Sequence, residues 1–253
     1  LVYRGDAHLI RGRLVAAATD IRASAHNFEQ MGNRLSQRTV AAQLARIDLH
    51  HGRLPAVVAE LSPLLDTMLD KKEHHAATLP LFGPLIEAHL HQDQIDEALA
   101  VDRRVAPILA GITPSTHSFY RLFAAQVELW LAVLARDPAA RRSARARAEE
   151  ALARLRKTAK MFPVGRASLQ RVEGQLAAAT GDLRGAGRAF ADAAATAQRL
   201  GYRKEEALAR YLAGLHGAAE RPDAALQAAH ALFSQLRMPV FVARCEDALR
   251  RKS

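Results

Sequence analysis

Turn signals recur along the chain at near-constant spacing, and each one separates two stretches with helical apolar periodicity. They are Gly12-Arg13-Leu14, Gly52-Arg53-Leu54, Asp93-Gln94-Ile95, Asp137-Pro138, Gly181-Asp182-Leu183 and Arg221-Pro222-Asp223. The steps between them are roughly 40 to 44 residues, a period typical of repeated helical units. A single helix pair cannot bury its apolar face alone, so successive pairs must stack. The spacing therefore predicts an α-solenoid of about six antiparallel helix pairs.

The composition agrees with an all-α fold. Apolar residues make up 49% of the chain but aromatic residues only 5%. Most of the apolar share is Ala and Leu, which favour helices, and there are few of the β-branched or aromatic runs that favour strands. We therefore expect the fold class to be all-α throughout.

The expected helices follow from the apolar periodicity between the turn signals. Pro80 and Pro84 should disturb the helix in which they fall, because proline removes a backbone donor. A final helix should cover the last apolar face as a cap. The expected ranges are 14–31, 36–51, 55–69, 75–91, 95–109, 115–136, 139–161, 203–219, 223–236 and, for the capping helix, 239–250, with one further pair in 167–200.

We expect residues 1–253 to form a single domain, because no stretch has the composition of a linker. If there is a subdivision, it should fall at the longer loops, 111–116 or 162–166. The chain begins with Leu1, inside a helical pattern, and we interpret it as part of a longer polypeptide that carries any catalytic activity. The lone Cys245 allows no intrachain disulfide, which fits a cytoplasmic protein, and we expect it to be a packing residue. Neither a signal peptide nor an apolar run long enough to span a membrane is recognisable.

The unit 167–200 resembles a tetratricopeptide repeat. It has a small residue in its first helix (Gly174), the turn Gly181-Asp182, and then Ala186, Phe190 and Ala193 at offsets of four and three. It departs from that family in two ways: Gln198 stands where the family usually has proline, and the period exceeds 34 residues. Both departures are typical of the longer, degenerate repeats attached to bacterial signalling ATPases, serine/threonine kinases and LuxR-type regulators.

This resemblance implies a right-handed superhelix and a non-catalytic scaffold for protein interaction or ligand sensing, at the C-terminus of a bacterial signalling protein. In such arrays the first helix of each pair lines a concave groove, which usually holds a peptide or a helix. Aligning the turns places seven polar residues at the inward positions: Arg46, His50, Glu87, His91, Arg171, Gln175 and Arg210. We expect these residues to contact a protein or peptide partner.

The positive charge is concentrated in one segment. The chain has a net charge of +10, and residues 136–166 hold 10 of the basic residues and 3 of the acidic ones. We expect a basic helix face built from Arg141, Arg142, Arg145, Arg156, Lys157 and Lys160. It is most simply a solvated face, with Arg141 and Arg145 near Glu149 at helical spacing. An acidic protein partner ranks next, and nucleic-acid or membrane binding ranks third because aromatic residues for base stacking are nearly absent nearby.

The histidines and the missing motifs favour a chain that is not an enzyme. His50-His51, His74-His75 and His89/His91 lack the spacing at which two imidazoles share one helix face. We therefore expect no metal, and read these residues as surface histidines near helix C-termini, although His50 and His91 fall at equivalent turns of neighbouring units. There is no phosphate-binding loop, His-Glu-x-x-His, Gly-x-Ser-x-Gly or Cys-x-x-Cys pattern, and we expect no cofactor.

Overall fold

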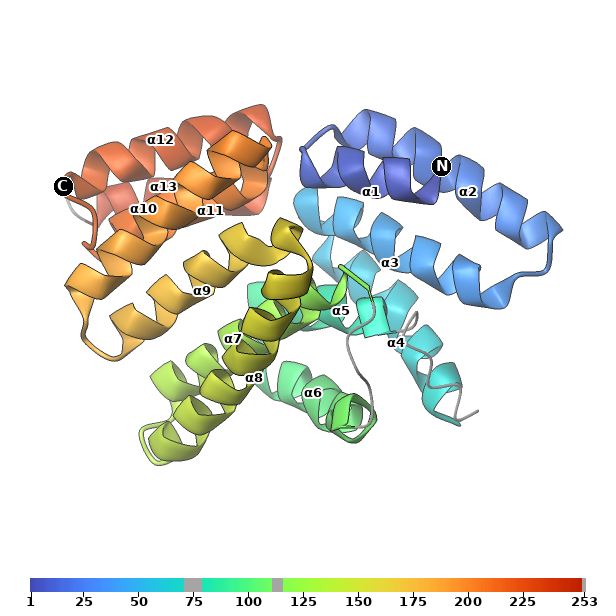
Figure 1. Ribbon diagram of the computed structural model, residues 1–253, viewed down its shortest axis with the longest axis horizontal. Coiled ribbons are helices and arrows are strands. Elements are labelled where there is room, and N and C mark those ends of the chain that lie inside the picture. Colours follow the sequence, from blue (N-terminus) through green and yellow to red (C-terminus); the bar gives the residue numbers. More distant parts are fainter. Residues whose placement is uncertain (71–78, 111–115, 252–253) are drawn as a thin grey trace.

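The structure is a computed structural model that describes residues 1–70, 79–110 and 116–251. Within these ranges the chain is all-helical and contains no β-strand (Figure 1). The α-helices are α1 (Val2–Ile10), α2 (Leu14–Gln30), α3 (Arg34–His50), α4 (Leu54–Asp70), α5 (Phe82–His91), α6 (Ile95–Ala110), α7 (Phe119–Arg136), α8 (Arg141–Met161), α9 (Arg166–Ala179), α10 (Leu183–Leu200), α11 (Arg203–Leu215), α12 (Pro222–Gln235) and α13 (Pro239–Arg250). Two short 3-10 helices, Leu79–Leu81 and Pro163–Gly165, precede α5 and α9. The all-α class is thus confirmed for the described part of the chain.

Every helix packs against the next one along the chain. The first helices of successive pairs also contact each other, α1 with α3, α3 with α5, and so on to α11. These odd-numbered helices therefore form one layer, and the even-numbered helices flank it (Figure 1). The predicted packing of each helix pair on its neighbours is present.

Left-handed backbone conformations end the first helices at most of the predicted turns. Gly12, Gly52 and Gly181 have φ angles of +72°, +73° and +88°, which glycine adopts without steric cost. Asp93 has a φ of 57° at the corresponding place between α5 and α6. In the last pair the left-handed residue is Gly217, so α11 ends at Leu215 and not at residue 219 as predicted.

The largest difference from the expected helices lies before α5. The predicted helix 75–91 begins only at Phe82, and residues 75–78 lie outside the described ranges. Pro84 falls in the first turn of α5, where a helix needs no backbone donor. In a helix that began at residue 75, the missing N–H of Pro84 would have left the carbonyl of Pro80 without its partner.

The buried apolar side chains form three clusters. The largest extends from α3 to α9 and includes Leu109 and Phe119, which stand before and after the expected loop 111–116, most of which lies outside the described residues. It also includes Leu155 and Val172, on either side of loop 162–166. A second cluster joins α10 to α13, and a small one joins α1 to α3. The core therefore continues across both loops at which a subdivision was expected.

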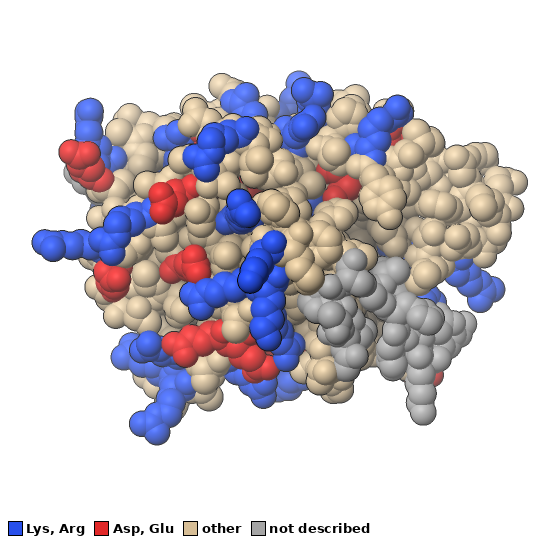
Figure 2. Space-filling model, viewed as in Figure 1, with Lys and Arg blue, Asp and Glu red and all other residues tan. Residues whose placement is uncertain are grey.

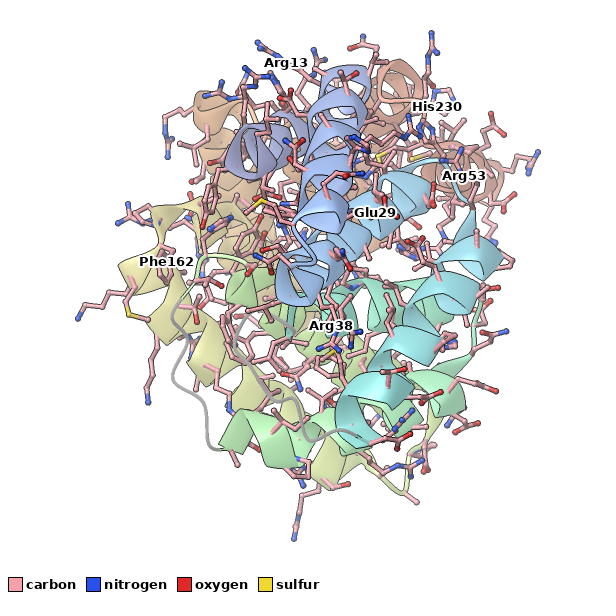
Figure 3. The ribbon with its side chains drawn as sticks, turned by 90° about the vertical axis from the view of Figure 1, so that its right-hand side faces the viewer. Arg13, Glu29, Arg38, Arg53, Phe162 and His230 are labelled. Carbon is pink, nitrogen blue, oxygen red and sulfur yellow. The ribbon has the colours of Figure 1, made fainter. Side chains whose placement is uncertain are left out.

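The two ends of the array meet. The turn after α1 contacts the turn after α12, where Leu236 Cδ2 lies 2.5 Å from the position that a β-carbon on Gly12 would occupy. The turn after α3 contacts the start of α13 through Gly52 and Val240. Figure 1 shows α1 and α2 beside the C-terminal helices, and in Figure 3 Arg53 of the α3–α4 turn and His230 of α12 both lie in the upper right part of the view. The contacts of Gly52 with Val240 and of His91 with Phe241 place α13 at the C-terminal ends of α3 and α5.

Candidate functional site

A cavity of about 240 Å³ lies where the first helices of the pairs and α13 converge. We call it the central cavity. Its wall comes almost entirely from odd-numbered helices, namely α1, α3, α5, α7, α9, α11 and α13. Because these helices present one face each to the inside of the array, residues far apart in sequence come together here.

Six of the seven predicted groove residues line the central cavity. They are Arg46 and His50 from α3, Glu87 and His91 from α5, and Arg171 and Gln175 from α9. Arg210 does not line it: α11 contributes Lys204, Leu208 and Tyr211, and Arg210 falls off that helical stripe. Arg210 instead pairs with Glu206 on the same helix, at 3.0 Å. The role of the six residues as binding positions stays a prediction.

Arg171 is the centre of a buried ionic cluster on one wall. Its Nε donates to Glu205 Oε2 at 2.9 Å, and its Nη1 donates to Gln175 Oε1 at 3.1 Å and to Glu128 Oε1. Burial alone would lower the pKa of Arg171, but the two carboxylates outweigh it and raise that pKa. For Glu205, burial acts to raise the pKa, and Arg171 outweighs it and lowers that pKa. Arg171 and Glu205 are therefore both charged, and Glu128 adds a second ion-pair partner for Arg171.

A second ionic cluster surrounds Asp6. Its carboxylate accepts hydrogen bonds from Arg46 at 2.9 Å, from Arg121 at 3.1 Å and from His117 at 2.8 Å. Burial opposes ionisation of Asp6, yet Arg121, His117 and Arg46 hold its pKa well below the usual range. A further cavity of about 440 Å³, lined by Asp6, Gln43 and their neighbours, shares Arg46, Glu87 and Arg121 with the central cavity.

His50 is not the surface histidine that the sequence suggested. Its side chain is only 3% exposed, and its Nδ1 lies 2.9 Å from the carbonyl oxygen of Arg46. A carbonyl can only accept, so Nδ1 carries the proton and Nε2 presents a lone pair. Burial, and then the charge of Lys204, lower the pKa of His50 well below its ordinary value, so the ring is neutral. Nε2 is buried and has no hydrogen-bond partner in the structure.

His91 is also neutral and lies at the contact between the two ends of the array. Burial and the nearby guanidinium of Arg244 lower its pKa to about 4. Its ring meets Phe241 of α13 edge to face, with 5.2 Å between the ring centroids, and its Nδ1 lies 3.2 Å from Arg244 Nη1. In the described ranges no three His, Cys, Asp or Glu residues form a group that could hold a metal ion, and His74 and His75 lie outside those ranges.

The predicted basic face lies on α8, away from the central cavity. All six predicted residues are exposed. Arg145 pairs with Glu149 at 2.9 Å and Arg156 with Glu173 at 2.8 Å. The other four, Arg141, Arg142, Lys157 and Lys160, have no carboxylate partner among the described residues. Figure 2 shows blue and red side chains mixed over the lower part of this view, where α8 lies.

Cys245 is buried in the core of α13, as expected for a packing residue. Burial, with a smaller contribution from Glu246, raises the pKa of its thiol to about 11, so the thiolate that a nucleophile requires is scarce near neutral pH. None of the described helices combines the length and the apolar character that crossing a membrane requires.

Several residues of the two cavities escaped the sequence reasoning. Lys204 and Glu205 stand at the start of α11, six and five residues before the predicted position Arg210. Arg244 comes from α13, which the repeat pattern identified only as a cap. Asp6 and Arg121 had no local signal, because their pairing joins segments 115 residues apart in sequence. A search for charged residues on the inward stripe of every first helix would have found Lys204 and Arg121, but not Arg244.

In comparisons with known proteins, no family model, no curated protein and no solved structure matches this chain.

Proposed function

We propose that this chain is a non-catalytic ligand-sensing scaffold and that its ligand occupies the central cavity. The observation that carries the proposal is the central cavity itself, whose wall brings together charged side chains from α3, α5, α7, α9, α11 and α13. Concave sites with a few convergent polar groups are the usual places where small ligands bind.

The size of the cavity favours ligand sensing over peptide binding. The tetratricopeptide resemblance suggested an open groove for a peptide or a helix, but Phe241 and Arg244 of α13 line the cavity and contact His91 of α5. Sites for drug-sized ligands have about 300–1,000 Å³. The cavity volume of about 240 Å³ therefore suits a small metabolite, or a few side chains of a protein partner.

The ionic clusters support binding rather than catalysis. Arg171 forms ion pairs with both Glu128 and Glu205. A general acid or base needs a pKa close to the working pH, and these pairings move the pKa of Arg171 upward and that of Glu205 downward, away from neutrality. We therefore place any catalytic activity outside this chain.

We further propose that the helix pairs form a right-handed, tetratricopeptide-like superhelix within a longer cytoplasmic bacterial signalling protein. The resemblance of residues 167–200 and the serial packing of the odd-numbered helices support this assignment. Both ends of the array contribute to the cavity wall, Leu9 from α1 and Arg244 from α13. A ligand between them would hold the ends together and so change the curvature felt by an attached domain.

A second candidate function is binding of an acidic protein or a nucleic acid at the basic face of α8. The observation in its favour is that Arg141, Arg142, Lys157 and Lys160 are exposed and have no carboxylate partner among the described residues. Such cations can neutralise phosphates or carboxylates.

The proposal is tested by a substitution that fills the cavity with a larger side chain. Ala132 lines the cavity on α7 and is only half-buried, so Ala132→Phe narrows the space without removing a charge. The wild type, Ala132→Phe and the control Arg210→Gln are each equilibrated with a metabolite extract and analysed by native mass spectrometry. We expect the wild type and the control to retain a small molecule that Ala132→Phe does not retain. Equal retention by all three proteins, or none by the wild type, would refute the proposal.

A further inference from the structure

A cleft of about 660 Å³ lies where the two ends of the array meet, and all of its charged residues are arginines. We call it the arginine cleft. The turn after α1, the C-terminal end of α10, the start of α11 and the end of α12 form its walls. Among the described residues no aspartate or glutamate lines it. Its four charged residues are Arg11, Arg13, Arg199 and Arg203.

The contact between the two ends lies within this cleft. Gly12 and Leu236, whose close approach joins the turn after α1 to the turn after α12, both line it. Two of the arginines flank Gly12, and the other two come from the C-terminal end of the array. Figure 3 shows Arg13 on the surface, at the upper end of α2. A molecule bound in the cleft can therefore touch both ends.

The four arginines have no carboxylate partners. The side chains of the two arginines in the turn after α1 make no hydrogen bond or ion pair with any described residue. Arg199 Nη2 donates to the hydroxyl of Thr196 at 3.1 Å, and Arg203 Nη2 donates to Oε1 of Gln235 at 2.5 Å. Both acceptors are neutral. Four positive charges thus share one cleft without a negative charge beside them.

This arrangement selects for a multiply charged anion. A cleft lined by charges of one sign focuses the field and concentrates counter-ions, and guanidinium groups bind phosphate oxygens in pairs. One phosphoryl group carries about 1.5 to 2 negative charges at pH 7, so it balances only about half of the four arginines. A chain of linked phosphoryl groups balances all of them and presents oxygens to both sides of the cleft.

We propose that the arginine cleft binds an oligophosphate, either the phosphate chain of a nucleotide or a free polyphosphate, between Arg11 and Arg13 on one side and Arg199 and Arg203 on the other. This is a second site and goes beyond the proposed function, because no residue of the arginine cleft lines the central cavity. The bound chain ties the turn after α1 to α10 and α11. It therefore stabilises the arrangement in which the two ends of the array meet.

Calorimetric titrations in the absence of divalent cations test the chemistry of the ligand. The probes are tripolyphosphate, ATP, inorganic phosphate and a short single-stranded DNA. The wild type should bind tripolyphosphate about 10-fold or more tightly than phosphate, because more charge-assisted hydrogen bonds form. Tighter binding of ATP than of tripolyphosphate would identify a nucleotide, and equal or weaker binding would identify the phosphate chain alone; both support the proposal.

Two outcomes of these titrations would overturn it. One is that neither tripolyphosphate nor ATP binds more tightly than phosphate. The other is that the DNA binds more tightly than both, which would make the cleft a nucleic-acid site.

Double variants on the two sides of the cleft test its location. Arg11→Gln with Arg13→Gln removes the charges of one end, and Arg199→Gln with Arg203→Gln removes those of the other end. Each pair should weaken tripolyphosphate binding about 10-fold or more. Weakening by only one of the two pairs would overturn the bridging of the two ends.

Arg184→Gln with Arg188→Gln is the matched control. Both residues are exposed on α10, the helix that also carries Arg199, and neither lines the cleft or pairs with a described carboxylate. This variant loses the same charge and should bind tripolyphosphate as the wild type does. Equal weakening in all three double variants would mean that the anion is attracted only by the net charge of the chain, and would overturn the site.

Thermal unfolding gives a second readout. Tripolyphosphate should raise the melting temperature of the wild type and of the control, and should raise it less in both cleft variants, because a ligand stabilises only the state that binds it. The melting temperatures without ligand show whether each variant is folded. The titrations of the wild type need no variant, so a folding defect in one of them leaves the choice between oligophosphate and phosphate testable.

Discussion

The ring of Phe190 lies directly against the backbone of Gly174. A β-carbon on Gly174 would stand 2.6 Å from Cε1 of Phe190, closer than any real side chain permits. Gly174 is on α9 and Phe190 is on α10, so this contact closes the pair that showed the clearest repeat pattern. The small residue of the first helix is therefore there to admit the large residue of the second.

Replacing Phe190 should strongly destabilise the protein. Phe190 is 1% exposed and belongs to the cluster that joins α10 to α13. Phe190→Ala leaves a cavity at this contact and should lower the free energy of unfolding by about 3–5 kcal/mol. Urea denaturation followed by circular dichroism measures this change. A loss below about 1 kcal/mol would mean that the ring contributes little to the packing of α9 on α10.

The same contact predicts a coupled effect at Gly174. Gly174→Ala should destabilise by about 1–3 kcal/mol, because the added methyl group forces the ring of Phe190 out of its place. Phe190→Leu provides room for the methyl group, so the double variant should be more stable than the sum of the two single changes implies. If the changes in the free energy of unfolding of the two single variants simply add up in the double variant, the ring of Phe190 moves away from the added methyl group without cost.

The contact between the ends of the array can be measured with two glycines. Gly12 and Gly32 have similar φ angles, +72° and +63°, but a β-carbon on Gly12 would meet Leu236, whereas one on Gly32 would meet nothing within 4 Å. Gly32→Ala should thus cost only the backbone strain, about 1 kcal/mol. Gly12→Ala should cost about 1 kcal/mol more, because Leu236 must move. Equal losses in thermal or urea denaturation would mean that the turns after α1 and α12 do not pack tightly in solution.

The helices themselves were largely predictable, because their ends depend on local chemistry. Asp182 accepts a hydrogen bond from the backbone of Gly185 at 2.8 Å and starts α10, and Pro239 starts α13, both at the residues that the pattern indicated. The predicted helix 75–91 was wrong at residues 79–81, which form a 3-10 helix before α5 begins at Phe82, because Pro80 and Pro84 were given too little weight. The class of each element was therefore easier to infer than its first residue.

The site was predictable only where the repeat alignment applied. It brought His50, His91 and Arg171 to one cavity, but it did not reveal that His50 is buried or that α13 contributes to the same cavity wall. Those features depend on contacts between residues some 150 positions apart, such as His91 with Arg244, for which periodicity carries no information. The burial of His50 and the position of α13 in the cavity wall are therefore set by tertiary contacts, which the local sequence pattern does not contain.

The basic face should behave as a solvated surface. We expect single-stranded DNA to bind the chain no more tightly than roughly 10⁻⁵ M at physiological salt, which is within the range of non-specific binding. Lys157→Glu combined with Lys160→Glu should weaken even this binding. Fluorescence anisotropy of labelled DNA at several salt concentrations measures the affinity of both proteins. Tight binding with a steep salt dependence that the double variant abolishes would instead favour the basic face as the functional site.

The neutral state of His91 predicts how stability depends on pH. The pKa of His91 is about 4 in the folded protein, against 6.5 for an unperturbed histidine. Between these values the unfolded chain binds a proton that the folded chain does not, so the free energy of unfolding falls as the pH falls from 6.5 to 4 and this contribution is constant below 4. At 1.36 kcal/mol per unit of pKa, the total loss from His91 is about 3 kcal/mol.

His91→Gln isolates this contribution, because glutamine can accept from Arg244 and does not titrate in this range. Urea denaturation of both proteins at a series of pH values should show the wild type losing up to about 3 kcal/mol relative to the variant between pH 6.5 and 4. The other histidines, including His50, titrate in both proteins and cancel in the difference. If the free energies of unfolding of the two proteins change with pH in parallel, His91 is hydrated in solution, and hence α13 does not pack against the end of α5. A stability difference that follows the predicted course would place the closed array, with its cavity, in solution.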